Sequence, residues 1–151
     1  MSEQESQGSQ LVLQRIYIKD LSFESPGSPD SFRSAWKPKI GLELNSKHAN
    51  IEASLWEVIL SVTVTARNEE DQVMYLAEVH QCGIFHIEGL DDETREQTLG
   101  AFCPAVLFPY ARETIDSLVV KGSFPPLMLA PVNFDAVYEQ TKQARAAEQP
   151  Q

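Results

Sequence analysis

The sequence lacks the features of a membrane-spanning, secreted or nucleic-acid-binding protein. No apolar run approaches the ~18 residues of a membrane span, and residues 1–10 have no basic stretch followed by an apolar one, as a signal peptide would. The two cysteines, Cys82 and Cys103, form no CxxC pair, which predicts reduced thiols in a cytoplasmic protein. Only 12 Lys and Arg residues accompany 22 Asp and Glu, a formal net charge of −10. Such a surface repels nucleic acid and favours basic proteins or segments.

Catalytic motifs are also missing. The chain has no GxxxxGK[ST] phosphate loop, no GxGxxG and no GxSxG, so nucleotide hydrolysis is not indicated. His80 with Glu78, and His86 with Glu88, could each share a strand face, but no spacing fixes four metal ligands. We therefore expect no metal, no cofactor and no enzymatic activity. A small-molecule enzyme that uses Cys103 or the histidines is the remote alternative.

The length of 151 residues, 42% of them apolar, predicts a single domain. Both ends are polar and poor in large apolar side chains. We expect a disordered N-terminal tail over 1–10, a folded domain over 11–140 and a flexible C-terminal tail over 141–151.

Period-two alternation of apolar and polar residues predicts four consecutive strands in the first half of the chain. Their short and medium connections favour an antiparallel sheet. In the first strand, Leu21 and Phe23 occupy odd positions and alternate with Asp20 and Glu24. The apolar residues upstream, Val12, Ile16 and Ile18, occupy even positions instead. That strand therefore needs a β-bulge or cover on both sides. The four strands are expected at about 11–24, 39–46, 56–65 and 73–85.

The second half changes to helical periodicity, which makes the fold α+β, with helices packed on one face of a four-stranded antiparallel sheet. Gly100 and Gly122 are expected to end two helices, and Pro109 to kink the longer one. Asn133 is a good N-cap for the last helix. The helices are expected at about 91–100, 104–121 and 134–145.

One sheet face can be assigned from strand parity. Asp20 and Glu24 on the first strand, with Leu76 and Glu78 on the fourth, are expected to point away from the helices. An ordinary solvated face is one interpretation. An acidic docking patch with an apolar centre, suited to a cationic partner, is the other.

Phe32 and Trp36 lie in a Pro- and Gly-rich connection rather than in a periodic element. They either pack under their own loop or form the wall of a groove that binds apolar side chains.

Several segments in consistent order resemble the SecB family of bacterial protein-export chaperones. The resemblance covers about residues 11–140. Its motifs are QRIYIKDLSFE at 14–24, GIF at 83–85, LGAFCP at 99–104, LFPYARE at 107–113 and LAPVNFD at 129–135.

The resemblance implies an ATP-independent chaperone that holds unfolded secretory precursors in a translocation-competent state and delivers them to the SecA motor. It implies a homotetramer, a dimer of dimers, with inward residues of the fourth strand supporting the helical layer at the oligomer interface. A SecB-like holdase that guards the antitoxin of a toxin pair, or another non-secretory client, is the alternative that the resemblance leaves open.

The family positions transfer to this sequence residue by residue. The SecA-binding positions match Asp20, Glu24, Leu76 and Glu78. The client-binding groove corresponds to Phe32, Trp36, Leu42, Leu44, Phe134 and Tyr138. The oligomer-interface positions correspond to Ala77, Val79 and Gln81.

Overall fold

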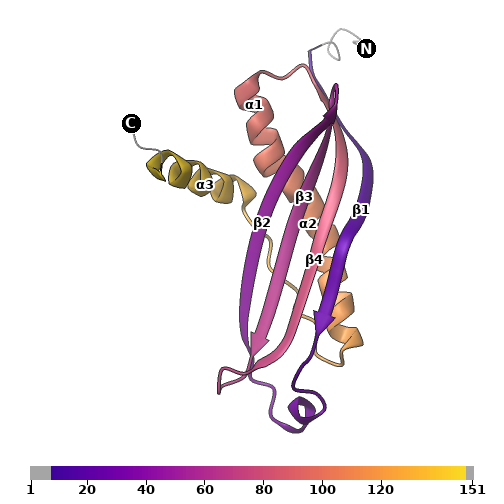
Figure 1. The fold of residues 1–151 in the computed structure, drawn as a ribbon, viewed down its shortest axis with the longest axis vertical. Helices are drawn as coiled ribbons and strands as arrows, with labels where there is room; N and C mark the ends of the chain where they lie inside the picture. The colour runs from indigo at the N-terminus through magenta and orange to yellow at the C-terminus, as the bar shows by residue number, and fades with distance from the viewer. Residues whose placement is uncertain (1–7, 149–151) are drawn as a thin grey trace.

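The computed structural model describes residues 8–148. Residues 1–7 and 149–151, the outer parts of the two expected tails, lie outside the described residues. The four strands are β1 (Gln10–Glu24), β2 (Lys39–Glu52), β3 (Leu55–Arg67) and β4 (Val73–Glu88). They form one antiparallel sheet in the order β1-β4-β3-β2, so β1 and β2 are its edges (Figure 1).

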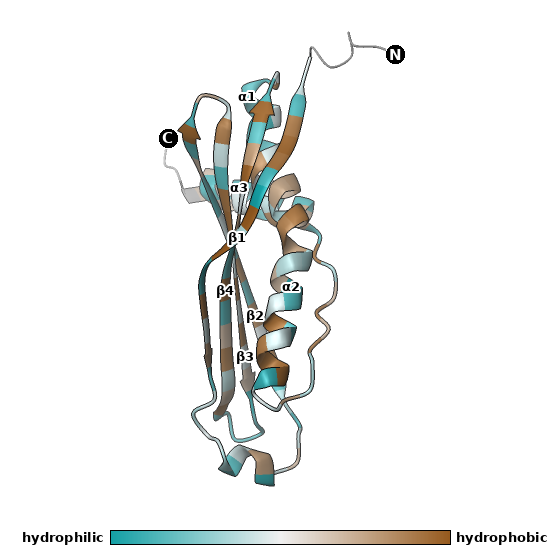
Figure 2. Cartoon of the chain, turned by 90° about the vertical axis from the view of Figure 1, so that its right-hand side faces the viewer, coloured by the Kyte–Doolittle hydropathy of each residue, from teal (hydrophilic) through white to brown (hydrophobic). Residues whose placement is uncertain are grey.

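All helices that pack on the sheet lie on one side of it, which confirms the predicted α+β fold (Figure 2). The short η2 (Asp30–Arg33) sits in the loop after β1. We call the helix-covered side of the sheet the inner face and the opposite side the outer face. Strand β2 extends to Glu52, well past the predicted end at 46, because its polar residues pair with β3 as far as the turn at Ala53.

Strand β1 has the irregular register that its sequence requires. Its pairing with β4 shifts between Leu13 and Arg15 and again between Ile18 and Asp20. Each shift inserts one extra residue, which reverses the parity of the side chains that follow. The predicted change of parity is therefore confirmed, and Asp20 and Glu24 reach the outer face.

The helical layer begins at α1 (Asp92–Gln97), where the Asp91 carboxylate accepts a hydrogen bond from the Thr94 amide at 2.7 Å. The predicted end of a helix at Gly100 is wrong. The chain continues through a π-helical turn, η3 (Thr98–Phe102), directly into α2 (Cys103–Lys121). The irregularity thus precedes Pro109, which lies inside a continuous α2. Gly122 ends α2 as predicted.

The connector between α2 and α3 (residues 122–133) runs back beside α2 before α3 (Phe134–Glu148) begins (Figure 1). Asn133 caps α3 as predicted, because its Oδ1 accepts from the Ala136 amide at 3.1 Å. The helix continues to Glu148, beyond the predicted 145, through residues that were expected to belong to the tail.

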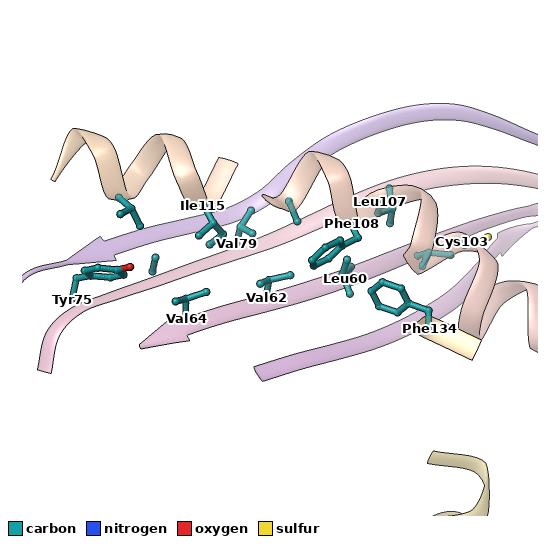
Figure 3. Packing of buried hydrophobic residues seen from close by; sticks show 14 of the residues in the cluster. Leu60, Val62, Val64, Tyr75, Val79, Cys103, Leu107, Phe108, Ile115 and Phe134 are labelled. Carbon is teal, nitrogen blue, oxygen red and sulfur yellow. The ribbon is translucent and has the colours of Figure 1, made fainter. Parts of the chain in front are cut away.

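The hydrophobic core lies between the inner face and α2 (Figure 3). Alternate residues of β3 and β4 supply one layer, because a strand turns every second side chain to the same side. Helix α2 supplies the other layer through Leu107, Ala111, Ile115 and Val119, which are all fully buried. Among residues 8–148, no helix is long and apolar enough to cross a bilayer.

Candidate functional site: an acidic sheet face and an apolar groove

The four predicted docking residues lie together on the outer face. Glu24 of β1 pairs with Leu76 of β4, and Glu78 and Asp20 occupy the next two rows toward the middle of the sheet. Leu76 and Glu78 are half-buried, whereas Asp20 and Glu24 are exposed. The structure therefore places the three carboxylates in three successive rows of the outer face, with Leu76 in the end row beside Glu24 and not at the centre of the patch.

Few groups neutralise these carboxylates. Glu78 Oε2 accepts a hydrogen bond from Thr63 Oγ1 at 3.0 Å and lies 3.5 Å from His80 Nε2. Within residues 8–148, no Lys or Arg forms an ion pair with Asp20, Glu24 or Glu78. The patch therefore presents negative charge to solvent, where it attracts cations at distances up to about 10 Å at ordinary ionic strength.

A polar network across β4 lies beside this patch. Lys19 Nζ is 2.7 Å from Glu57 Oε2, and the Tyr17 hydroxyl donates to the same oxygen. These two hydrogen bonds lower the pKa of the Glu57 carboxyl, and burial together with the Glu57 bond raises the pKa of Tyr17. The network joins the edge strand β1 to β3 and rests over Cys82.

The loop aromatics predicted for the groove do not pack only on their own loop. Phe32 and Trp36 both contact Phe124 of the connector, with ring centroids 5.3 and 5.4 Å apart. Trp36 also stacks on Tyr75 of β4 at 6.3 Å. Burial raises the pKa of Tyr75 to about 12. Phe32 remains 48% exposed, so the cluster offers an aromatic surface to solvent.

A cavity of about 340 Å³ lies between β2, η3 and α3. Leu44, Phe134 and Tyr138, all predicted groove residues, line it together with Val137. The packing of Tyr138 beside this cavity requires glycine at position 100, because a Cβ atom there would lie 2.5 Å from the Tyr138 ring. The absence of a side chain at this position allows α3 to approach η3 closely.

Leu42 does not line this cavity. Leu42 and Ile40 lie on the inner face of the edge strand β2, each 40% exposed, between the aromatic cluster and the cavity. The six predicted residues therefore form two clusters that are joined along β2. We refer to the aromatic cluster, the β2 row and the cavity together as the groove.

Sequence reasoning missed several groove residues. Tyr75 could have been included from its parity with Ala77, and Ile40 from its alternation with Leu42. Phe124 lies in a Pro-rich segment without periodicity, so no sequence signal placed it against Trp36.

The connector is fixed to α2 by polar contacts. Asp116 Oδ1 accepts from the Leu127 amide at 3.0 Å and from the Met128 amide at 3.3 Å. Arg112 donates to the Leu129 carbonyl at 3.5 Å. The Met128 side chain is 77% exposed, whereas Leu127 and Leu129 pack against the core.

The predicted oligomer-interface residues lie inside the protomer. Ala77 and Val79 have no exposed surface, and Gln81 is 2% exposed. Gln81 Nε2 donates to the Tyr17 carbonyl at 3.1 Å, while its Oε1 has no hydrogen-bond partner among the described residues 8–148. Ala77, Val79 and Gln81 therefore face the helical layer inside the protomer and do not reach its surface.

The residues considered for catalysis are dispersed. Cys82 and Cys103 are buried, and burial raises the pKa of both thiols, to about 12 for Cys103. His86 contacts Glu88 at 3.1 Å, as its spacing predicts. In the part of the chain from 8 to 148, no three His, Cys, Asp or Glu side chains gather as metal ligands.

Comparison with known proteins agrees with this architecture. A family profile described as "Preprotein translocase subunit SecB" matches residues 3–145. The "Protein-export protein SecB" of Pseudomonas fluorescens is 58% identical over 139 residues, covering 92% of this chain and 87% of its own. That of Pseudomonas paraeruginosa is 54% identical over 146 residues, covering 93% and 90%.

A solved structure shares the fold at low sequence identity. It is the SecB-like chaperone of Mycobacterium tuberculosis in complex with a ChAD peptide from the HigA1 antitoxin. Its TM-score is 0.67 at 19% identity, with 85% of this chain and 93% of that chain covered. The family match and the identity to the Pseudomonas proteins together establish that the chain belongs to the SecB family.

Proposed function

We propose that the protein is a cytoplasmic, ATP-independent export chaperone that binds unfolded secretory precursors and delivers them to SecA. The identity of 54–58% to relatives named protein-export protein SecB, over more than nine-tenths of the chain, carries this proposal. An export chaperone needs a surface for clients and a separate surface for the motor, and the groove and the acidic patch lie on opposite faces of one sheet.

The groove suits reversible binding of extended apolar segments. Phe32, Leu42 and Val137 each expose apolar surface, one in each of the three parts of the groove. Burying apolar area contributes about 25 cal/mol per Å², without regard to sequence. A folded client no longer exposes such area and dissociates, so no nucleotide is needed for release.

The acidic patch suits a basic partner. Asp20, Glu24 and Glu78 would attract a cationic segment of SecA, and Leu76 would supply an apolar contact in the row of Glu24. Charge of this kind mainly accelerates association and selects partners, whereas the apolar contact holds the complex together.

Assembly as a dimer of dimers would complete the molecule. The edge strand β1 has an unpaired side, and pairing with its copy would remove an exposed edge that otherwise promotes aggregation. Phe102 at the end of η3 and Tyr110 and Val120 of α2 are each about half exposed, which fits a covered helical layer between two sheets. Several grooves on one tetramer would bind one long client together, because binding at one groove raises the effective concentration of the client at the others.

The antitoxin-guarding alternative has weaker support. The SecB-like chaperone seen with an antitoxin peptide is 19% identical and shares only the fold, whereas the export protein of Pseudomonas fluorescens is 58% identical. We therefore favour secretory precursors as clients.

The deciding experiment is a refolding assay without nucleotide. A slow-folding precursor is diluted from denaturant with the protein in stoichiometric amount, and SecA is then added. We expect a slowed refolding rate and transfer of the client to SecA. An unchanged refolding rate would overturn the chaperone function, and client retention in the presence of SecA would overturn the delivery step.

A further inference from the structure

A second hollow, of about 410 Å³, lies on the outer face beside the acidic patch. It extends from Glu78 and His80 on β4 across β3 to Glu43 and Lys47 on β2. None of the β2 residues belongs to the docking positions proposed above. The hollow therefore continues the docking surface toward the far edge of the sheet, where β2 runs in Figure 1.

Strand pairing explains the shape of the hollow. Glu43, Thr63 and Glu78 form one row across three strands, and Asn45, Ser61 and His80 form the next. In these two rows β3 contributes only the short hydroxyl side chains of Thr63 and Ser61, so the floor is low there, and Ile59 of β3 lines the hollow in the next row, beside Lys47. Thr63 holds Glu78 by a hydrogen bond, which leaves that carboxylate with a fixed orientation.

The two ends of the hollow carry opposite charge. Glu43 and Glu78 flank the Thr63 row, whereas Lys47 and Lys19 line the other end. Lys19 is paired with Glu57, but no acidic side chain among residues 8–148 forms an ion pair with Lys47. Since a strand rises about 3.3 Å per residue, Glu43 and Lys47 are about 13 Å apart along β2.

We propose that this hollow receives an extended segment of the docking partner, with a basic side chain between Glu43 and Glu78. Lys47 excludes a second basic side chain about four residues further along the segment. Glu43 is then a further docking residue, and Lys47 determines specificity by repulsion. This inference rests on the proposed docking of SecA to the outer face.

The test measures the affinity of the full-length protein for purified SecA at low and physiological salt. Glu43→Gln is expected to weaken binding about two- to fivefold, as for an exposed charge pair, and the effect is expected to shrink with salt. Lys47→Gln is expected to strengthen binding about twofold. Glu52→Gln, the same charge change on β2 outside the hollow, is the matched control and is expected to leave the affinity unchanged.

Three outcomes would overturn the inference, and they separate it from the docking proposal. If Glu24→Gln weakens binding and Glu43→Gln does not, the docking face stands and its extension to β2 is wrong. If Glu43→Gln and Glu52→Gln weaken binding equally, the affinity depends on the net charge of the protein and not on the hollow. If neither Glu24→Gln nor Glu43→Gln changes the affinity, the docking face itself is wrong.

Discussion

Tyr75 and Leu76 are neighbours in β4, but they belong to different kinds of surface. Tyr75 is fully buried on the inner face, in an aromatic cluster drawn from the sheet, the loop after β1 and the connector. Leu76 lies on the outer face, in a patch made by β1 and β4 alone. The outer face thus needs only correct strand pairing, whereas the groove needs most of the tertiary structure.

The largest expected effect on stability comes from truncating Tyr75, the buried residue of this pair. Tyr75→Ala removes an aromatic side chain that contacts Phe23, Trp36 and Phe124. We expect the free energy of unfolding to fall by about 3–5 kcal/mol, measured by urea denaturation, because a cavity remains among the rings. Client binding is expected to fall with it.

Leu76→Ala is the matched substitution on the outer face. We expect it to cost about 1 kcal/mol of stability and to leave client binding intact, because the side chain is half-buried and outside the core. Equal losses of stability for the two variants would contradict the division between the faces.

An intermediate effect, on client affinity, is expected at Gly100, where the Tyr138 ring of α3 approaches η3 closely. Gly100→Ala would force the Tyr138 ring away from η3 and narrow the cavity. We expect affinity for a fluorescently labelled unfolded precursor to fall about tenfold, or about 1.4 kcal/mol, within the range of overpacking costs. Gly41→Ala is the control, because its nearest atom would lie 3.9 Å away. Equal affinities for the two variants would contradict the role of Gly100.

The smallest expected effect is on the pH dependence of stability, through Glu57 on the outer face. The pKa of Glu57 is lowered in the folded protein by its bonds to Lys19 and Tyr17, so these bonds stabilise the fold above the ordinary carboxyl pKa of 4.5. As the pH falls through and below this value, we expect that contribution, about 0.5 kcal/mol, to be lost. Urea denaturation at several pH values should therefore give a flatter profile for Glu57→Gln. A profile as steep as that of the unsubstituted protein would contradict the assignment.

Much of the sheet could be predicted because its signals are local. The conflict between Leu21 and the upstream apolar residues indicated a bulge, and the register of β1 contains two shifts. The end of β2 could not be predicted, because Lys47 and Asn50 are polar and lie in the strand through pairing with β3, which the Asn50 side chain reinforces by donating to the Ala53 and Leu55 carbonyls. Gly100 was misread for a related reason: a glycine that ends a helix and one that admits a neighbouring ring look the same in sequence.

The acidic patch was predictable in its geometry, since Asp20 and Glu78 follow from strand parity. The groove was predictable only in part. Leu44, Phe134 and Tyr138 do meet at one cavity, but the resemblance to SecB proteins, rather than any periodicity, grouped them. The contact of Phe124 with Trp36 spans nearly ninety positions and depends on how the connector folds back over α2.

The attachment of the connector to Asp116 has a consequence for how the two surfaces are built. One carboxylate holds the Leu127 and Met128 amides, and neither bond involves the sheet. The polar attachment of this segment is therefore independent of the register of the strands. The contacts that hold the connector in place are thus separate from the strand pairing that forms the acidic patch.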